Sequence, residues 1–395
     1  MKAVILAAGE GTRMRPLTYS CPKVMLTVAN KPILEHIMDA TIGAGIDEFV
    51  FITGFHENAV KEYFGDGSSW GVDIQYVTQL EQKGTADAIK HADGYVDGHF
   101  IVLNGDVLVT KDYLKKLVSK KSDAVITAKE VDNPSEFGVI DVSGDNVTQI
   151  VEKSSNPPTN LANTGIYLFH DSIFEYIDRT PLSERGELEI TDSMQMMIDD
   201  GKQVTYKLLD NEWIDIGRPW DMLDANKLLL QNIKSNNKGS VEPYATIKGE
   251  VVIGKNTVVK NGSYIEGPVV IGEDCDIGPN CYIRPSTCIG NHVKIGNAVE
   301  VKNTIVMDAT NIGHLAYVGD SVVGKRCNFG AGTKVANLRH DDKTIKSTTK
   351  GKRVDTGRRK LGVIMADDVH TGINTSINVG VVLERNTKPG EVLVK

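Results

Sequence analysis

The stretch Leu6–Met14, which reads LAAGEGTRM, follows a short apolar run, Ala3–Leu6, that is typical of a buried strand. Glycine accepts backbone angles that other residues resist, and its missing side chain lets a ligand approach the main chain. Successive N–H groups in such a turn can hold an anion, and Arg13 offers a planar fork of donors that fits phosphate oxygens. The stretch therefore predicts a phosphate-binding loop after the first strand of an α/β domain. It is not a Walker A loop, because no Gly-Lys-Ser/Thr sequence closes it.

Residues 1–230 alternate between strand-like and helix-like patterns. Apolar, β-rich runs follow the first strand at 49–52, 74–77, 100–103 and 124–127. Helix-period stretches lie between several of them, at 33–38, 59–64 and 113–118. This alternation predicts βαβ units and a Rossmann-like α/β domain with a mostly parallel sheet. Ligands bind beyond the carboxyl ends of such strands, so the residues directly after strands are the site candidates.

Two carboxylates occupy positions of this kind. Asp106 follows the strand expected at 100–103, and Asp215 stands at a later junction between a strand and a turn. Mg²⁺ usually takes one or two protein carboxylates together with substrate oxygens, so the pair predicts a Mg²⁺ site. The alternative for Asp106 is a simple Asx turn. Lys23 lies in the long loop that starts at the phosphate turn, which makes it a candidate for contacting the reacting phosphate.

This combination resembles the sugar-phosphate nucleotidylyltransferases. Leu6–Met14 with Pro22-Lys23 is similar to their signature, and further matches follow in family order at 79–88, 104–106, 137–140, 151–153 and 163–167. The resemblance covers nearly all of the first 230 residues. It implies nucleotide contacts at Leu6, Ala8, Gly9, Gly11, Thr12, Gln79, Gly84 and Thr85, with Gln79 reading a pyrimidine base. It implies sugar-phosphate contacts at Gly138, Glu152, Lys153 and Asn163.

The implied reaction suits these residue types. The phosphate of a sugar 1-phosphate attacks the α-phosphorus of a nucleoside triphosphate, and pyrophosphate leaves. Because the nucleophile is already an anion, alignment and charge cancellation replace a general base. By resemblance, Asp106 and Asp215 hold Mg²⁺, which acts with Lys23 at the α-phosphate, while Arg13 acts at the pyrophosphate. Asp215 departs from the bacterial bifunctional relatives, where Asn is common, and matches the thymidylyltransferases, so uracil and thymine both stay open.

From Ile247 the pattern changes, because an apolar residue recurs every six positions as far as Met307. Six residues fit a short strand and a turn, so each repeat forms one side of a coil. The step shortens by one residue at Ile312 and at Val323, and the hexad returns near the end at Met365, Thr371, Ile377 and Leu383. Resemblance to hexapeptide-repeat proteins implies a left-handed parallel β-helix and a homotrimer. The expected organisation is a nucleotidylyltransferase domain over 1–230, a polar linker over 231–245 and a β-helix acyltransferase domain over 246–395.

A structural role, which holds subunits together, is the plain alternative for the β-helix. The segment Gly313–Asp320, followed by Asn328–Thr333, favours an active site instead. Together with Arg284-Pro285, Glu300–Lys302 and Asn337, the pattern resembles the acetyltransferase half of the bifunctional glucosamine-1-phosphate acetyltransferase/N-acetylglucosamine-1-phosphate uridylyltransferase family. Archaeal members of that family also resemble the chain at Gly357–Gly362. This second match covers most of the chain in order.

Acetyl transfer requires a base that deprotonates the attacking amine, and histidine suits that role near neutral pH. By resemblance His314 is this base, and Ala331 offers a backbone group to the thioester of acetyl-CoA. The other implied contacts are to the sugar phosphate, from Arg284 and Lys302, and to the sugar, from Tyr317, Asn328 and Asn337. The loop 338–360 is rich in Lys and Arg. It can meet the phosphates of coenzyme A, a neighbouring subunit or solvent.

The hexads end soon after Leu383, and the stretch 384–390 carries no clean hexad. Relatives with both activities usually carry additional coils that help to bind coenzyme A. The departure therefore bears on the affinity for acetyl-CoA rather than on the histidine site.

Composition limits the possible functions. The chain has 395 residues and a net charge of −8, which disfavours general nucleic-acid binding. Its five cysteines are scattered and lack metal-ligand spacing, so we expect free thiols in a reducing compartment. No apolar run approaches about 18 residues, and no signal-peptide pattern is present. These features predict a cytoplasmic protein that binds no membrane.

The sequence thus predicts a bifunctional enzyme that acetylates glucosamine 1-phosphate with acetyl-CoA and couples the product to UTP, or to dTTP. The main product would be UDP-N-acetylglucosamine. A second hypothesis is a single-activity nucleotidylyltransferase for glucose 1-phosphate or mannose 1-phosphate, with a structural or regulatory β-helix. His314 with Asn328 separates these two. A third, a non-catalytic assembly protein similar to subunits of translation exchange factors, is disfavoured because Arg13, Lys23, Asp106 and Asp215 are all present.

Overall fold

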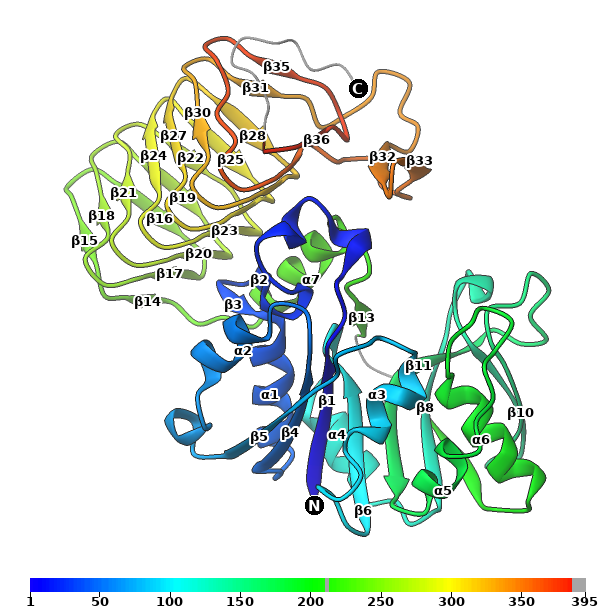
Figure 1. Cartoon of the computed structure of the whole chain (residues 1–395). Coiled ribbons are helices and arrows are strands. Elements are labelled where there is room, and N and C mark those ends of the chain that lie inside the picture. The colour runs from blue at the N-terminus through cyan, green and yellow to red at the C-terminus, as the bar shows by residue number, and fades with distance from the viewer. Residues whose placement is uncertain (210–212, 386–395) are drawn as a thin grey trace. The chain divides into compact units, whose positions relative to one another are not determined.

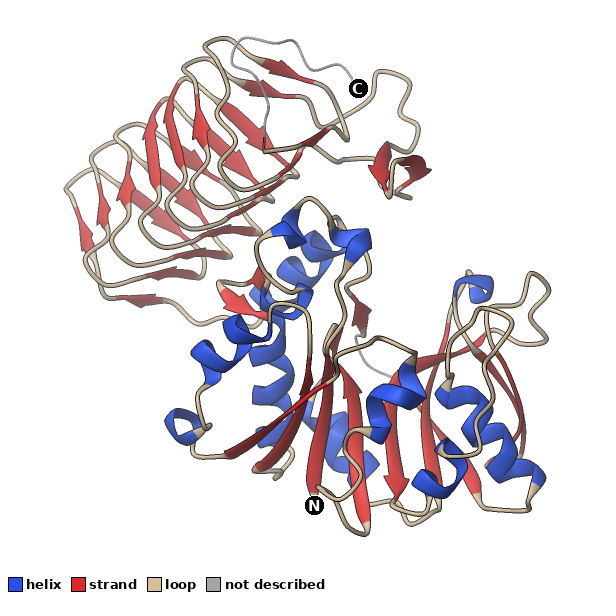
Figure 2. Cartoon of the chain, viewed as in Figure 1, coloured by secondary structure: helices blue, strands red, loops and turns tan. Residues whose placement is uncertain are grey.

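The computed structural model describes residues 1–209 and 213–385 (Figures 1 and 2). The chain forms two compact units. The first consists of Met1–Glu10 and Ile33–Asp215, and the second consists of Gly11–Pro32 and the chain from Ile216 onward. The stretch Leu6–Met14 therefore has residues in both units.

The first unit is built on a nine-stranded sheet, in the order β5-β4-β1-β6-β11-β8-β12-β10-β9 (Figure 1). Its strands are β1 Lys2–Ala7, β4 Glu48–Thr53, β5 Asp73–Thr78, β6 His99–Asn104, β8 Ala124–Glu130, β9 Val139–Ser143, β10 Asn146–Val151, β11 Leu161–His170 and β12 Val204–Leu208. The run from β5 to β6 is parallel, as expected from the alternating pattern. β11 lies antiparallel between β6 and β8, and β12 is parallel to β8.

The central strands are buried on both faces, which explains their nearly continuous apolar runs. Val4 belongs to the core on one face, and its neighbours Ala3 and Ile5 are fully buried on the other. Three helices lie where the helix-period stretches are expected, namely α1 Ile33–Gly43, α2 Glu57–Phe64 and α4 Lys111–Val118. Three further helices pack on one another, namely α3 Thr85–Lys90, α5 Ile173–Ile177 and α6 Ile190–Asp199.

The second unit contains a coil with three sides. Pairing of Ile247 with Ile265, of Ile265 with Ile283 and of Ile283 with Val301 repeats every 18 residues, which is three hexads. Val301 pairs with Val318, one residue sooner, as the shortened step predicts. The inward residues form one continuous apolar core. The expected left-handed parallel β-helix is confirmed, and between Gln231 and Arg385 the described residues form only short strands, turns and loops (Figure 2).

Three parallel sheets make up the sides of the coil. The eight-stranded sheet holds β14 Asn236–Asn237, β17 Val251–Ile253, β20 Val269–Ile271, β23 Thr287–Ile289, β26 Ile305–Val306, β29 Val322–Val323, β34 Ile364–Met365 and β36 Val382–Leu383. The six-stranded sheet holds β15 Ser240–Val241, β18 Val258–Val259, β21 Asp276–Ile277, β24 Lys294–Asn297, β27 Asn311–His314 and β30 Asn328–Phe329. The seven-stranded sheet holds β16 Thr246–Lys248, β19 Tyr264–Glu266, β22 Tyr282–Ile283, β25 Glu300–Lys302, β28 Tyr317–Gly319, β31 Lys334–Val335 and β35 Ser376–Ile377.

The β-helix begins earlier than the sequence suggests. β14 and β15 lie inside the segment 231–245, which was expected to be a linker, and they pair with β17 and β18. Their pairing uses the backbone, so the polar composition of this segment gives no hint of it. The linker is therefore shorter than predicted, while the domain boundary near 230 stays a prediction. Most of the stretch 384–390 lies outside the described residues.

An insertion interrupts the coils between Asn337 and Leu361. It contains an antiparallel hairpin of β32 Lys346–Thr349 and β33 Lys352–Asp355, which the hexad pattern does not predict. All five cysteines lie in the described part of the chain and are free, as expected. No helix within 1–209 or 213–385 is long and apolar enough to cross a membrane.

The segment Gly11–Pro32 is attached to the β-helix through α7 Asp221–Leu230. Asn226 on α7 is fully buried; its Oδ1 accepts from the Ala29 N–H at 2.9 Å, and its Nδ2 donates to the Ser286 carbonyl at 2.9 Å. Ala29 lies between two short strands of the segment, β2 Thr27–Val28 and β3 Lys31–Pro32. A small apolar core of Leu230, Val270 and Cys288 packs beside this junction. The buried amide of Asn226 therefore joins α7 to the segment Gly11–Pro32 and to the β-helix.

Asn226→Ala should lower the free energy of unfolding of the second unit by about 1–3 kcal/mol, because it removes both hydrogen bonds of a fully buried amide and leaves the partly buried Ala29 N–H and Ser286 carbonyl without that partner. Chemical denaturation followed by circular dichroism measures this change. The exposed Asn232, changed in the same way, is the control and should behave like the wild type. Equal stability of the two variants would contradict a structural role for Asn226.

Candidate active sites

The first half of the phosphate loop is fixed at Ala8. Its carbonyl accepts from the Phe55 N–H at 3.2 Å and from Gln82 Nε2 at 2.7 Å. A Cβ on Gly54 would lie 3.0 Å from the same oxygen, so glycine lets the two loops approach. The loop therefore leaves β1 in one defined direction. Gln82 is not among the expected site residues, although it lies in the matched stretch 79–88.

The other expected nucleotide contacts of the first unit follow β5. Gln79 is buried, and its Nε2 donates to Asp87 at 2.6 Å, so a carboxylate on α3 orients the amide expected to read the base. Gly84 has φ +125°, and a Cβ there would lie 2.3 Å from the Leu188 carbonyl oxygen. Thr85 accepts from the Ile190 N–H at 3.0 Å, which ties the start of α3 to α6. Only glycine fits at position 84.

The two candidate metal ligands are brought together. β13 Ile214–Asp215 pairs with β7 Val107–Leu108, and Asp215 lies opposite Val107, next to Asp106. Their oxygens suit Mg²⁺, which takes one or two carboxylates and leaves the remaining positions to substrate and water. Within 1–209 and 213–385 no group of three or more His, Cys, Asp and Glu side chains could hold a metal ion. Asp106 and Asp215 provide two carboxylates, a number that suits Mg²⁺.

The four expected sugar-phosphate residues also meet. The Asn163 N–H donates to the Gly138 carbonyl at 2.8 Å, and the Lys153 N–H donates to the Phe137 carbonyl at 3.2 Å. A Cβ on Gly138 would lie 2.5 Å from Glu152 Oε2, so glycine leaves that carboxylate its place. Lys153 has φ +40°, an uncommon backbone angle for a residue with a side chain.

A cavity of about 660 Å³ opens beside Glu152 and Lys153. Its volume lies within the range of about 300–1,000 Å³ that is usual for small-molecule sites. Arg185 lines it and forms ion pairs with Glu152 at 3.1 Å and with Glu189 at 3.2 Å. Burial raises the pKa of Glu189, and burial likewise raises the pKa of Asp192, which also lines the cavity. The sequence interpretation names none of these three residues as site residues, because their nearness to Glu152 arises only on folding.

The second half of the loop belongs to the second unit. Gly11 has φ +61° and precedes a 3₁₀ turn, Thr12–Met14. A Cβ on Gly11 would lie 2.8 Å from the Cβ of Lys23, so the Lys23 stem packs directly on the glycine. Lys23 is only 8% exposed. The structure therefore brings two of the expected phosphate-binding residues into contact, while the Arg13 side chain is exposed.

Residues expected at the acetyltransferase site cluster on the outer face of the seven-stranded sheet. Lys302 Nζ lies 3.6 Å from Asp320 Oδ2, and Asn337 Nδ2 donates to the Tyr317 hydroxyl at 3.0 Å and to Asp320 Oδ2 at 2.5 Å. Arg284, one coil earlier, pairs with Glu300 at 2.8 Å. Asp320 and Glu300 belong to the quoted motifs, but neither is predicted as a site residue. These carboxylates orient the cations that the sequence singles out.

The positive charges around Lys302 suit the binding of an anion. Burial lowers the pKa of Lys302, the Asp320 carboxylate opposes that change, and the nearby Lys360 ammonium lowers the pKa further. Repulsion between Lys302 and Lys360 is relieved when an anion binds between them. Burial raises the pKa of Tyr317, so its hydroxyl remains a donor. A cluster of this charge and burial can hold an anion, in line with the sugar-phosphate contacts expected at Arg284 and Lys302.

His314 is the last residue of β27, directly before a corner of the coil. Its side chain is exposed, its carbonyl accepts from the Gly332 N–H at 3.1 Å, and Leu315 turns the corner with φ +50°. The register of β27 with β30 places Ala331 beside His314, one coil further along. Tyr317 follows on the other side of the corner. Within the described chain no hydrogen bond joins the His314 side chain to the Lys302–Asp320 cluster.

Asn328 lies on the six-stranded sheet, whereas Tyr317 lies on the seven-stranded sheet. Asn328 is exposed in β30 and forms a bridge with His370. The basic loop 338–360 makes several internal ion pairs, including Arg339 with Asp341 at 2.6 Å and Arg359 with Asp342 at 2.7 Å. Part of its positive charge is thus neutralised within the loop.

Comparisons with known proteins agree with both halves. The family model for nucleotidyl transferases matches residues 2–232, and the model for the GMPPB C-terminal domain matches residues 265–388. The bifunctional protein GlmU of Methanocaldococcus jannaschii is 44% identical over 98% of this chain and 92% of its own. The bifunctional sugar-1-phosphate nucleotidylyltransferase/acetyltransferase of Sulfurisphaera tokodaii is 41% identical over 100% of this chain and 97% of its own. A solved structure of a candidate glucose-1-phosphate thymidylyltransferase from Bacillus anthracis has a TM-score of 0.55 and 31% identity, and the match covers 60% of this chain and 98% of that one.

Both relatives that match over nearly the full chain are named as bifunctional. The interpretation of a nucleotidyltransferase followed by an acetyltransferase β-helix is confirmed, and the single-activity alternative is not better supported. The chain belongs to the family of bifunctional sugar-1-phosphate nucleotidylyltransferase/acetyltransferases.

Proposed function

We propose that this enzyme acetylates glucosamine 1-phosphate with acetyl-CoA and then joins the product to UTP, giving UDP-N-acetylglucosamine and pyrophosphate. The observation that carries the proposal is the cluster of Arg284, Lys302 and Tyr317 on one face of the β-helix, beside the exposed His314. A β-helix that only joins subunits needs no half-buried lysine held by a buried aspartate. The departure at Asp215 adds dTTP as a second nucleotide substrate.

The acetyltransferase site acts through His314. The amine nitrogen of glucosamine 1-phosphate attacks the carbonyl carbon of the thioester. A C–N bond forms and the C–S bond breaks. The amine proton passes to His314 and then to the leaving sulfur, so that coenzyme A departs as its thiol. Arg284 and Lys302 hold the sugar phosphate, Tyr317, Asn328 and Asn337 contact the sugar, and the backbone of Ala331 contacts the thioester.

The nucleotidyltransferase site acts through charge and alignment. A phosphate oxygen of the sugar 1-phosphate bonds to the α-phosphorus, and the bond from that phosphorus to the β-phosphate oxygen breaks. Lys23 contacts the α-phosphate and Arg13 the leaving pyrophosphate. Asp106 and Asp215 would hold Mg²⁺, which supplies charge neutralisation between the phosphates. The nucleotide lies on Leu6, Ala8, Gly9, Gly11, Thr12, Gln79, Gly84 and Thr85, and the sugar phosphate on Gly138, Glu152, Lys153 and Asn163.

The proposal includes a homotrimer formed through the β-helix and a cytoplasmic location. Resemblance to hexapeptide-repeat proteins supports the trimer, and the free cysteines support a reducing compartment. Light scattering of the purified enzyme measures its mass, and a monomer in solution would contradict the first part.

His314→Asn should reduce release of coenzyme A from acetyl-CoA and glucosamine 1-phosphate by about 10²–10⁴-fold, because the amine loses its base. A thiol-reactive dye measures the release. Pyrophosphate release with N-acetylglucosamine 1-phosphate should not change. The matched control is His292→Asn, an exposed histidine on another corner. Undiminished release by His314→Asn would favour a structural β-helix.

Asp106→Asn should reduce pyrophosphate release by about a hundredfold, because a neutral amide binds a cation far more weakly than a carboxylate does. The same change at Asp215 should act in the same direction, while acetyl transfer stays intact in both. A pyrophosphate assay across Mg²⁺ concentrations measures the effect, with the exposed Asp112→Asn as control. If Asp106→Asn and Asp112→Asn respond alike, the metal assignment is wrong.

The lowered pKa of Lys302 predicts a pH dependence of substrate binding. As the pH rises, Lys302 loses its proton below the ordinary lysine pKa of about 10.4, and its attraction for phosphate falls. The KM for glucosamine 1-phosphate in acetyl transfer should therefore rise in the wild type, and rise later in Lys302→Arg, because arginine keeps its charge. Lys294→Arg, on another face, should follow the wild type. Identical profiles for all three would show that Lys302 does not bind the phosphate.

A further inference from the structure

The segment Gly11–Pro32 carries Thr12, Arg13 and Lys23, yet its polar contacts run to distant parts of the β-helix. Near its end, Asn30 Nδ2 donates to the Ile289 carbonyl at 2.6 Å, next to the Ala29–Asn226 contact described above. Near its start, Thr349 of the inserted hairpin donates to the Arg13 carbonyl at 3.1 Å. The segment is therefore attached at both ends to strands that come more than 200 residues later.

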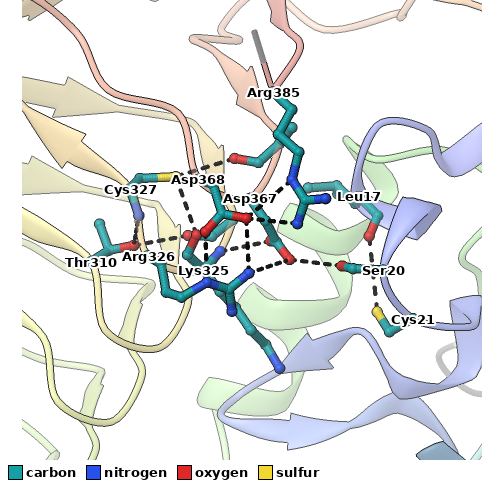
Figure 3. Close-up of polar contacts among 12 residues, drawn as sticks. Leu17, Ser20, Cys21, Thr310, Lys325, Arg326, Cys327, Asp367, Asp368 and Arg385 are labelled. Atoms are coloured by element: carbon teal, nitrogen blue, oxygen red, sulfur yellow. Dashed lines mark hydrogen bonds and ion pairs between the residues drawn. The ribbon is translucent and has the colours of Figure 1, made fainter.

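A third attachment lies in the middle, at Ser20. Its hydroxyl donates to Asp367 Oδ2 at 2.7 Å, and Asp367 is only 8% exposed. The other oxygen of Asp367, Oδ1, accepts from the Lys325 N–H at 2.8 Å, and Arg326 Nη2 lies 3.6 Å from Oδ2. Figure 3 shows Asp367 between Ser20 on one side and Lys325 and Arg326 on the other. A carboxylate fixed by a backbone N–H is thus aimed at this serine.

Inside the segment, Ser20 is coupled to the phosphate-binding residues. Thr18 donates its hydroxyl to the Gly11 carbonyl at 3.0 Å, and Gly11 packs on the stem of Lys23, as described above. Ser20 stands two residues after Thr18 and three before Lys23. A displacement of Ser20 would therefore move the turn that sets both Gly11 and Lys23.

The three attachments differ in how closely they pack and in which part of the segment they contact. Around Thr349 a cavity of about 450 Å³ separates Thr12, Arg15 and Tyr19 from Thr348, Lys350 and Glu384, so the hairpin covers the segment loosely. The Asn226 junction lies beyond Lys23, next to α7. Among these three attachments, it is Asp367 that is both buried and directed at the part of the chain between Arg13 and Lys23.

We propose that Asp367, a residue of the β-helix, is a positioning residue for nucleotidyl transfer, which acts through Ser20 on the loop that carries Gly11 and Lys23. The inference rests on the proposed role of that loop. It makes the last coils of the β-helix part of the nucleotidyltransferase machinery. Positional errors of about 1 Å at such a site can lower the rate by about 10²-fold.

Two single variants test the positioning role of Asp367. Ser20→Ala removes the donor of the Ser20–Asp367 hydrogen bond, and Asp367→Ala removes its acceptor. Each should lower kcat for pyrophosphate release by about ten- to a hundredfold. The double variant should lose no more than the worse single one, because both remove the same contact. Ser20→Thr keeps the hydroxyl and should restore most of the rate. Release of coenzyme A by Ser20→Ala should equal that of the wild type.

Asp368→Asn is the matched control. Asp368 pairs with Arg326 at 2.6 Å and with Arg385 at 2.6 Å in the same cluster, but it does not contact Ser20 (Figure 3). It should leave pyrophosphate release unchanged. If it slows release as much as Asp367→Ala does, the effect comes from the coils in general, and the assignment to Asp367 is wrong.

Hydrogen exchange separates this inference from the proposed function. Amides within Gly11–Pro32 should exchange faster in Ser20→Ala and in Asp367→Ala than in the wild type. Faster exchange with unchanged pyrophosphate release would overturn the positioning role. A wild type that releases no pyrophosphate would overturn the proposed function, and unchanged exchange would overturn the attachment itself.

Discussion

The stacking of aliphatic side chains along the inside of the coil is the interaction on which the second unit depends. Ile265 lies against Ile283, and Ile283 against Val301, at each turn of the chain. Because parallel pairing fixes this register, the outward residues also stack in columns, so that Glu300 lies beside Tyr317 and Lys302 beside Gly319. A rigid apolar interior thus sets the spacing of a polar outer face, which a substrate site requires.

The same regularity explains which features the sequence can predict. Hexads and alternating strands and helices are local patterns, so the β-helix and the α/β sheet are predictable, as is the meeting of Asp106 and Asp215 at neighbouring strands. Arg185 and Asp367 act through nearness that only folding creates, and neither carries a motif. β14 is missed for another reason, since Asn236 and Asn237 pair through their backbone and leave no apolar signal.

The segment Gly11–Pro32 shows most clearly where sequence periodicity fails. Its neighbours on both sides in the chain, Glu10 and Ile33, belong to the first unit, while the segment itself belongs to the second. Polar bonds from Ser20, Ala29 and Asn30 hold it there. Each bond joins residues far apart in sequence, so no window along the chain reveals it. Gly11 and Lys23, the expected phosphate-binding residues, are consequently part of the same compact unit as the coils of the β-helix.

The central claim is that one chain carries out both reactions in order. The most direct measurement incubates the purified enzyme with glucosamine 1-phosphate, UTP, Mg²⁺ and acetyl-CoA, and follows UDP-N-acetylglucosamine by mass spectrometry. The account predicts that this product forms, and that omission of acetyl-CoA abolishes it unless N-acetylglucosamine 1-phosphate replaces the amine. If the enzyme makes the nucleotide sugar only from the acetylated substrate, whether or not acetyl-CoA is present, the account of the β-helix is contradicted.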